Sequence, residues 1–152
     1  MVKHVDHINI VVSDLEHSVR FYTEALGLKE TRRARLTGDW IEAIVGLKGV
    51  EADVAFVQPI GGGPRIELIQ YRAPVGEEFA AHSRPNTHGL RHIAFQIDDM
   101  EVTRKRLEAA GVQFFGPPVE VPGGVVEHDD GRKSLCYFLD PDGVLLELAA
   151  YV

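Results

Sequence analysis

The sequence lacks several features that would assign it to a narrow class. Cys136 is the only cysteine among 152 residues, so an internal disulfide is excluded and a reducing compartment is expected. No apolar run reaches the roughly 18 residues that a membrane-spanning helix needs. The first ten residues, MVKHVDHINI, contain no apolar core of a secretion signal. These absences predict a cytoplasmic protein that does not enter a membrane.

Basic residues are also outnumbered. The chain has 16 Lys and Arg against 23 Asp and Glu, which gives a formal net charge of −7. Proteins that bind nucleic acid or anionic membranes in general need basic stripes, so neither is expected as a partner. A local basic pocket for a small acid is still compatible with this charge. We expect the partner to be a small-molecule substrate.

The chain does contain an internal repeat. HINIVVSDLE (7–16) matches HIAFQIDDME (92–101), with His, Ile, Asp and Glu at the same places. Both alternate apolar and polar residues with period two, which is typical of a half-buried strand. IELIQY (66–71) similarly matches LELAAY (146–151), with a glutamate second in each. The repeat predicts two related halves.

Each half is expected to contain a strand, a helix and three further strands. Between the repeated strands, we predict helices over 14–28 and 99–112, both ending at a glycine, and strands over 29–36, 52–58, 112–121 and 132–140. Further expectations are hairpin turns at 59–64 and 140–143, a short helix within 37–51, and a connector over 72–89 with a short helix around Phe79. The fold class is α+β, with two βαβββ units, unit 1 (about 3–72) and unit 2 (about 88–151), sharing the core of a single domain, 1–152.

Four polar residues occupy repeat-equivalent places in these strands. His7 and His92 alternate with isoleucines, whereas Glu67 and Glu147 alternate with isoleucine and leucine. Successive strand residues point to opposite faces, so all four should point away from the apolar side of their strands. Two imidazoles and two carboxylates suit an octahedral site for Mn, Fe, Co, Ni or Zn, with positions left for water or substrate.

The motifs together resemble the vicinal oxygen chelate superfamily, which includes glyoxalase I, methylmalonyl-CoA epimerase, extradiol dioxygenases and the bleomycin and fosfomycin resistance proteins. DHINIVVSDLEHSVRFYTEALGL, IELIQY, GLRHIAFQIDD and DPDGVLLEL carry the resemblance, which spans nearly the whole chain and is strongest to epimerase-like and glyoxalase I-like members. It implies a cup-shaped, partly open mixed β-sheet around one divalent metal ion per chain, and a homodimer. It also implies metal ligation by four residues, His7, Glu67, His92 and Glu147.

The same resemblance favours proton-transfer chemistry. A metal-dependent isomerase, epimerase or lyase would stabilise an enolate or enediolate of a small oxygenated carbonyl substrate, an acyl thioester included. The first alternative is an extradiol Fe(II) dioxygenase, which a fourth ligand at Glu67 disfavours because that ligand takes a position needed for catechol or dioxygen. The second alternative is a non-catalytic protein that sequesters its ligand. Either Glu67 or Glu147 could act as the general base, and Glu42 and Glu51 are less convincing candidates.

The other residues that could have a chemical role are interpreted mainly as structural or surface residues. The histidines without repeat partners are read as surface or loop residues, with His128 kept as a candidate pocket residue: His4, His17, His82, His88 and His128. IGGGP lacks the helix and the Lys-Ser/Thr that a phosphate loop requires. Cys136 lies in an apolar strand and is expected in the core. Arg132 and Lys133 are interpreted as a solvated charge pair, with binding of an acidic substrate group as the alternative. Trp40 could line a substrate pocket.

Overall fold

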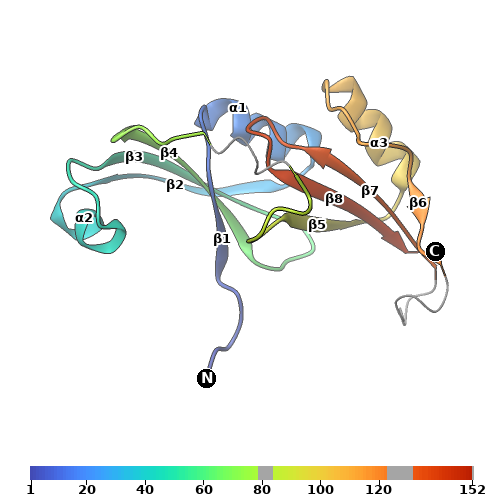
Figure 1. Cartoon of the computed structure of the whole chain (residues 1–152), viewed down its shortest axis with the longest axis horizontal. Helices are drawn as coiled ribbons and strands as arrows, with labels where there is room; N and C mark the ends of the chain where they lie inside the picture. Colours follow the sequence, from blue (N-terminus) through green and yellow to red (C-terminus); the bar gives the residue numbers. More distant parts are fainter. Residues whose placement is uncertain (79–83, 123–131, 152) are drawn as a thin grey trace. The chain divides into compact units, whose positions relative to one another are not determined.

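The computed structural model describes residues 1–78, 84–122 and 132–151. The chain divides into two compact units, Met1–Glu78 and Phe79–Val152, and each contains one open, four-stranded mixed sheet (Figure 1). In these described ranges no helix has the length and apolar character needed to cross a bilayer. The short helix expected around Phe79 falls outside them.

The first unit has the expected order of elements. They are β1 (His7–Val11), α1 (Leu15–Arg20), the π-helix η1 (Phe21–Ala25), β2 (Lys29–Thr37), α2 (Asp39–Val45), β3 (Glu51–Gln58) and β4 (Arg65–Ala73). The sheet order is β1-β4-β3-β2, with β1 parallel to β4 and the other pairs antiparallel. The expected helix over 14–28 is confirmed, but its second half is wound as a π-helix, and α2 lies within the segment expected to hold a short helix.

The second unit repeats this plan with one correction. Its elements are β5 (His92–Ile97), α3 (Met100–Ala109), β6 (Val119–Glu120), β7 (Lys133–Leu139) and β8 (Leu145–Tyr151), in the sheet order β5-β8-β7-β6. The strand expected over 112–121 is wrong for most of its length. Regular pairing with β7 is limited to the two residues of β6, and the rest of the contact is an isolated bridge from Phe114 to Phe138 and single backbone hydrogen bonds from Phe115 to Tyr137 and from Val121 to Lys133. The Gly-Pro-Pro at 116–118 explains this, because proline has no N–H to continue a ladder.

The two longer helical segments begin and end in the same way. Asp14 and Asp99 are their N-caps, and each side chain accepts a hydrogen bond of 2.9 Å from the backbone N–H three residues later. Gly27 and Gly111 follow the last turns with φ of 81° and 86°, a left-handed conformation that glycine adopts without strain. The repeat seen in the sequence is therefore also a repeat of helix-capping chemistry.

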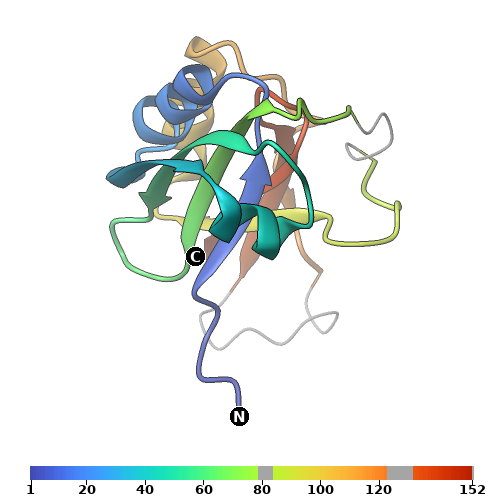
Figure 2. The same ribbon diagram turned by 90° about the vertical axis from the view of Figure 1, so that its left-hand side faces the viewer.

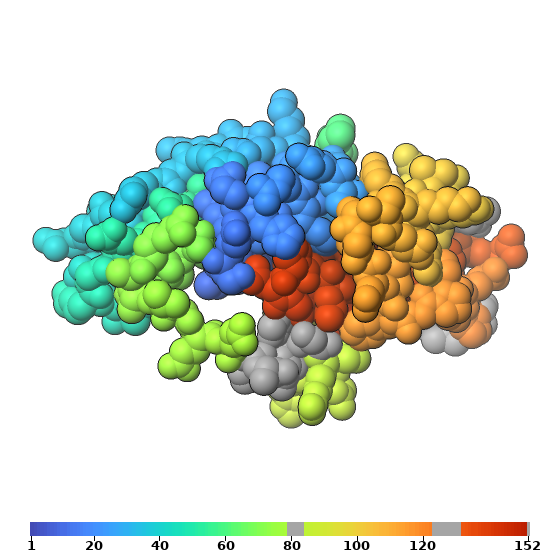
Figure 3. Space-filling model, turned by 90° about the horizontal axis from the view of Figure 1, so that it is seen from above, coloured from blue at the N-terminus to red at the C-terminus, as the bar shows by residue number. Residues whose placement is uncertain are grey.

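The sheet of the first unit is apolar on both faces. On one face, strand residues pack against α1 and η1, and the buried side chains include Ile10, Leu15, Val19, Tyr22, Ile66 and Leu68. On the other face, Ala52, Val54 and Ile69 form a buried cluster flanked by Leu36, Phe56 and Tyr71. In the view of Figure 1 α1 lies above this sheet and α2 at its left-hand end, and Figure 3 shows the α1 segment on the surface beside β2. Polar residues on the second face therefore border an apolar strip.

The expected turns are confirmed. In the glycine-rich segment 59–64, the N–H of Gly62 donates to the carbonyl oxygen of Pro59 at 3.0 Å. In DPDG, the carboxylate of Asp140 accepts from the backbone N–H groups of Asp142 and Val144 at 3.0 and 2.8 Å. Both segments connect neighbouring antiparallel strands, so the glycine-rich one is accounted for as a turn.

The segment that follows α2 depends on the ionised state of Glu42. The Glu42 carboxylate accepts from the Gly49 N–H at 2.7 Å and from Lys48 Nζ at 3.1 Å, and these contacts lower its pKa below the ordinary value of 4.5, the Gly49 bond being the larger cause. A lowered folded-state pKa means that the stabilisation is complete above the unfolded value and is lost as the pH falls through the folded value. We expect the Gly49 amide resonance to shift only below about pH 4.5, followed by NMR. In Glu42→Gln that titration should be absent; a persisting one would assign it elsewhere.

Candidate metal centre

The first half of the candidate centre is a histidine–glutamate pair on neighbouring strands. His7 on β1 and Glu67 on β4 lie on the same face of their sheet, with His7 Nε2 3.4 Å from Glu67 Oε2. Asn9, two residues after His7, donates from its side-chain amide to the same carboxylate at 2.9 Å. The Glu67 side chain is 18% exposed and that of His7 41%. This pair is therefore accessible and is held by one neutral donor.

The other nitrogen of His7 has a carboxylate partner. His7 Nδ1 lies 2.8 Å from Asp6 Oδ2, which Arg65 also contacts at 2.5 Å. The bond from His7, and after it that from Arg65, hold the pKa of Asp6 below its usual range, so Asp6 is an ionised acceptor. An ionised acceptor requires a proton on Nδ1, so a neutral His7 ring would bind an ion through Nε2. Metal-binding histidines usually have such an outer partner.

The second half repeats the pair in different surroundings. His92 on β5 places Nε2 3.5 Å from Glu147 Oε2 on β8. The other carboxylate oxygen, Oε1, lies 3.5 Å from Lys133 Nζ, and the side chain of Glu147 is only 5% exposed. Tyr137 donates a hydrogen bond to Glu147; burial, the carboxylate charge and this bond, in that order, raise the pKa of Tyr137. Glu147 is therefore a buried carboxylate with a cation and a hydroxyl beside it.

Sheet register makes the two halves equivalent position by position. Phe56 lies opposite Glu67 just as Tyr137 lies opposite Glu147, and each ring is near the histidine of its unit, at 6.1 and 5.3 Å between centroids. Asn9 pairs with Glu67 in the parallel ladder, where the second unit has Ala94. The backbone plan is thus repeated, but the groups that hold the carboxylates are not.

The donor atoms suit a divalent ion. Cis ligands of an octahedral ion lie about 3 Å apart when each bond is about 2.1 Å, close to the 3.4 and 3.5 Å between nitrogen and oxygen in the two pairs. Within the described residues, no group of three or more His, Cys, Asp or Glu side chains is gathered for an ion. Each unit therefore offers two ligands, and the four-ligand set remains a prediction.

Most other residues considered from the sequence are accounted for. Glu42 binds Gly49 and Lys48, and Glu51 binds Arg35 at 2.8 Å, so neither carboxylate is free to serve as a base. Cys136 is buried as expected, and burial raises the pKa of its thiol. Three histidines are on the surface as expected: His4, His17 and His88. His82 and His128 lie outside the described residues.

Sequence reasoning misjudged Lys133 and missed two further residues. Only Arg132 of the expected solvated pair is exposed, beside Glu120 at 3.3 Å, whereas Lys133 is 18% exposed and contacts Glu147. Asp6 and Tyr137 were not singled out. A signal was available for Lys133 and Tyr137, because the DPDG turn fixes the register of β7 on β8 and places them on the face of Glu147.

Comparison with known proteins identifies the family of this chain. Residues 4–148 match the Glyoxalase/Bleomycin resistance protein/Dioxygenase superfamily, and the chain belongs to that family. It is similar to a 2-epi-5-epi-valiolone epimerase of Actinomyces sp (28% identical, covering 95% of this chain and 77% of the relative). It is also similar to a probable lactoylglutathione lyase of Vibrio cholerae (27% identical, covering 93% and 86%).

A solved structure supports the fold. A glyoxalase family protein from Bacillus cereus has a TM-score of 0.84 to this chain, is 26% identical, and covers 100% of this chain and 96% of that one. The resemblance stated from the sequence motifs is therefore confirmed, as is the α+β class with two mixed sheets. The family contains an epimerase and a lyase, which supports an enzymatic role but does not select one reaction.

Proposed function

We propose that this chain is a divalent-metal-dependent isomerase, epimerase or lyase that moves a proton beside a carbonyl group. The observation that carries the proposal is the pair of repeat-equivalent His–Glu contacts, one of them with its histidine oriented by Asp6. In this proposal one ion would be held by the His7–Glu67 pair together with the His92–Glu147 pair. Co, Ni, Mn, Zn and Fe all accept such nitrogen and oxygen donors.

The ion, when bound, supplies Lewis-acid polarisation of the substrate oxygens, which makes the neighbouring C–H more acidic. The chain supplies the proton acceptor. Glu67 is the carboxylate assigned to this role, because it is the more accessible of the two and is held by the neutral amide of Asn9 and not by a cation. Glu147 is fixed by Lys133 and Tyr137, so its role in the proposal is to retain the ion, while the proton that Glu67 takes up returns to the substrate from Glu67.

The relatives support this reaction class. One is named a 2-epi-5-epi-valiolone epimerase and another a probable lactoylglutathione lyase, so an epimerase and a lyase are both among the proteins that this chain is similar to. The substrate class proposed for this chain is correspondingly a small oxygenated carbonyl compound, acyl thioesters included. The shared step is removal of a carbon-bound proton, which can be measured without knowing the natural substrate.

Elemental analysis and proton exchange together test the proposal. The purified full chain should contain about one divalent ion per chain, as expected for one ion held by two pairs. In D₂O, with the glutathione hemithioacetal of methylglyoxal, racemic methylmalonyl-CoA or dihydroxyacetone as probes, NMR should show loss of a carbon-bound proton for at least one of them. Chelation should stop the exchange and the ion should restore it. Tight ligand binding without an ion or exchange would instead select a sequestering protein, and consumption of oxygen with Fe(II) and a catechol would select a dioxygenase.

A further inference from the structure

Strand β2 contains a bulge close to the His7–Glu67 pair. In its register with β3, Glu30 pairs with Val57 and the next pair is Arg32 with Phe56, so Thr31 is an extra residue. The Thr31 hydroxyl donates to the Phe56 carbonyl oxygen at 3.2 Å. Because side chains alternate along a strand, one extra residue moves every later side chain to the other face.

The bulge determines which face of the sheet each of three nearby arginines occupies. Arg33 and Arg35 lie on the face covered by α1, where Arg33 binds the carboxylates of Glu16 and Glu30 and Arg35 binds that of Glu51 at 2.8 Å. Arg32 is exposed on the opposite face. In the part of the chain that the structure describes, Arg32 has no carboxylate partner.

Arg32 shares its face with the first half of the metal centre. Phe56 lies directly opposite Arg32 on one side and directly opposite Glu67 on the other. At a strand spacing of about 4.8 Å, the backbones of Arg32 and Glu67 are about 10 Å apart, a gap that a small molecule and an arginine side chain can fill together. The Phe56 ring is the surface between them, 6.1 Å from the His7 ring and 5.1 Å from the Arg65 guanidinium.

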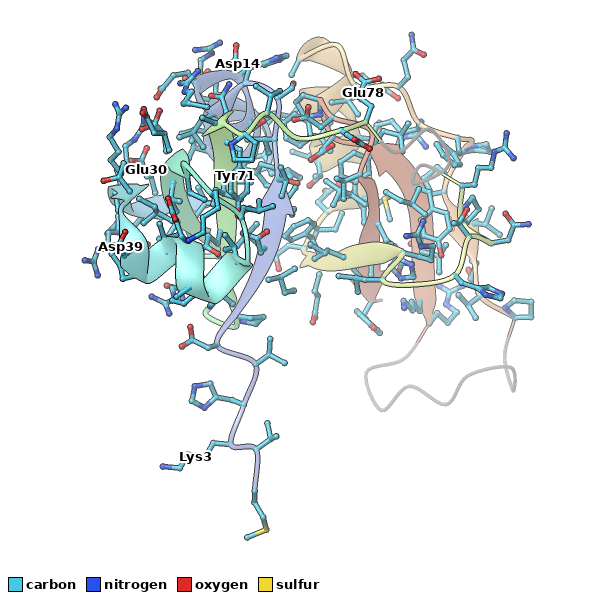
Figure 4. The ribbon with its side chains drawn as sticks, turned by 60° about the vertical axis from the view of Figure 1, so that its left-hand side comes forward. Lys3, Asp14, Glu30, Asp39, Tyr71 and Glu78 are labelled. Carbon is cyan, nitrogen blue, oxygen red and sulfur yellow. The ribbon has the colours of Figure 1, made fainter. Side chains whose placement is uncertain are left out.

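The charge of Arg65 is paired with a carboxylate, whereas that of Arg32 is not. Asp6 binds Arg65 at 2.5 Å, so the positive charge without a carboxylate partner beside Phe56 is that of Arg32. The same sheet face continues away from the pair as the apolar strip of Val54, Ile69 and Tyr71. Figure 4 shows Tyr71 on the side of this sheet that carries α2, the helix that lies in front of the sheet in Figure 2. In a chain of net charge −7, an anionic ligand is repelled in general and needs a local cation to bind.

We propose that Arg32 binds a carboxylate or phosphate group of the substrate, a few bonds from the carbonyl that meets the His7–Glu67 pair. This inference rests on the proposed function and narrows its substrate class to anionic 2-oxo or α-hydroxycarbonyl compounds. The planar guanidinium forms two parallel hydrogen bonds with either anion. Arg32 is in this view the residue that selects charged over neutral substrates.

Matched ligand pairs test the inference by calorimetry on the full chain. 2-Oxoglutarate and 2-oxopentanoate differ only in a terminal carboxylate or methyl group, and dihydroxyacetone phosphate and dihydroxyacetone differ by the phosphate. In the wild type, we expect the ligand with the terminal carboxylate or the phosphate to bind about 10- to 100-fold more tightly than its partner that lacks this group, in at least one of the two pairs. Arg32→Gln should abolish that preference, and Arg32→Lys should retain part of it. The pair that shows the preference distinguishes carboxylate from phosphate.

The control is Arg20→Gln, which removes the same charge from an exposed position on α1. An equal preference in wild type and Arg32→Gln, or an equal loss in Arg20→Gln, would overturn the inference. Ion content is measured in the same samples, and the titrations are repeated after chelation. Absence of an ion in the wild type would count against the proposed function alone, because the preference for the charged ligand is measured in both states.

Discussion

His92→Ala should lose both its divalent ion and its turnover. The substitution removes one of two imidazole ligands, and the affinity should fall by more than the roughly 10- to 100-fold that loss of an outer partner costs. The unit should remain folded, because His92 is 37% exposed and Glu147 keeps Lys133 and Tyr137 beside it. Elemental analysis after gel filtration and the proton-exchange assay measure the two losses.

His17→Ala is the matched control. This histidine is exposed on α1 and lacks a repeat-equivalent partner, so its removal should leave ion content and exchange unchanged. An His92→Ala protein that keeps wild-type ion content would remove His92 from the ligand set. Exchange that persists without the ion would remove the metal from the mechanism.

Glu67→Gln should reduce kcat by about 10²- to 10⁴-fold at saturating metal, the usual contribution of a general base. Glutamine keeps the size of the side chain and an oxygen that can accept from Asn9, but it does not take up a proton near neutral pH. Ion binding should weaken less than turnover does. Exchange rates measured over a range of metal concentrations separate the two effects.

Glu147→Gln is the informative counterpart. Its carboxylate is 5% exposed and balances the charge of Lys133, so the amide would leave a largely buried ammonium without its counter-charge. We therefore expect Glu147→Gln to lower the thermal midpoint and the ion affinity more than Glu67→Gln does. Should Glu147→Gln instead lose turnover with its ion and stability intact, the roles of the two carboxylates would be reversed.

Period-two patterning and the internal repeat predicted much of the fold and the two pairs. Alternation in HINIV and HIAFQI placed His7 and His92 on the polar faces of their strands, and the echo of IELIQY in LELAAY did the same for Glu67 and Glu147. Such predictions depend only on local backbone geometry, which the sequence encodes directly. The N-caps and terminal glycines of the helical segments are local in the same sense.

What the sequence did not reveal depends on register between strands. Arg32 and Lys133 lie on the sheet faces of the pairs because of a bulge in β2 and the pairing of β7 with β8, and neither position follows from the residue itself. The strand expected over 112–121 was wrong because apolar Val and Phe flank prolines that interrupt its pairing. Asp6 was overlooked because it precedes β1 and acts through the ring of its neighbour.

The two carboxylates share a backbone frame but have different neighbours. Asn9 stands where the other unit has Ala94, and Tyr137 stands where the first has Phe56. A substitution at residue 9 can therefore alter the hydrogen bonding of Glu67 without disturbing Glu147, and one at residue 137 can alter that of Glu147 without disturbing Glu67. A homodimer of a single ancestral half would have to change both carboxylates at once. When two copies are joined in one polypeptide, a mutation can change the surroundings of one carboxylate and leave those of the other unchanged. The contributions of the two halves to reaction specificity can therefore diverge separately.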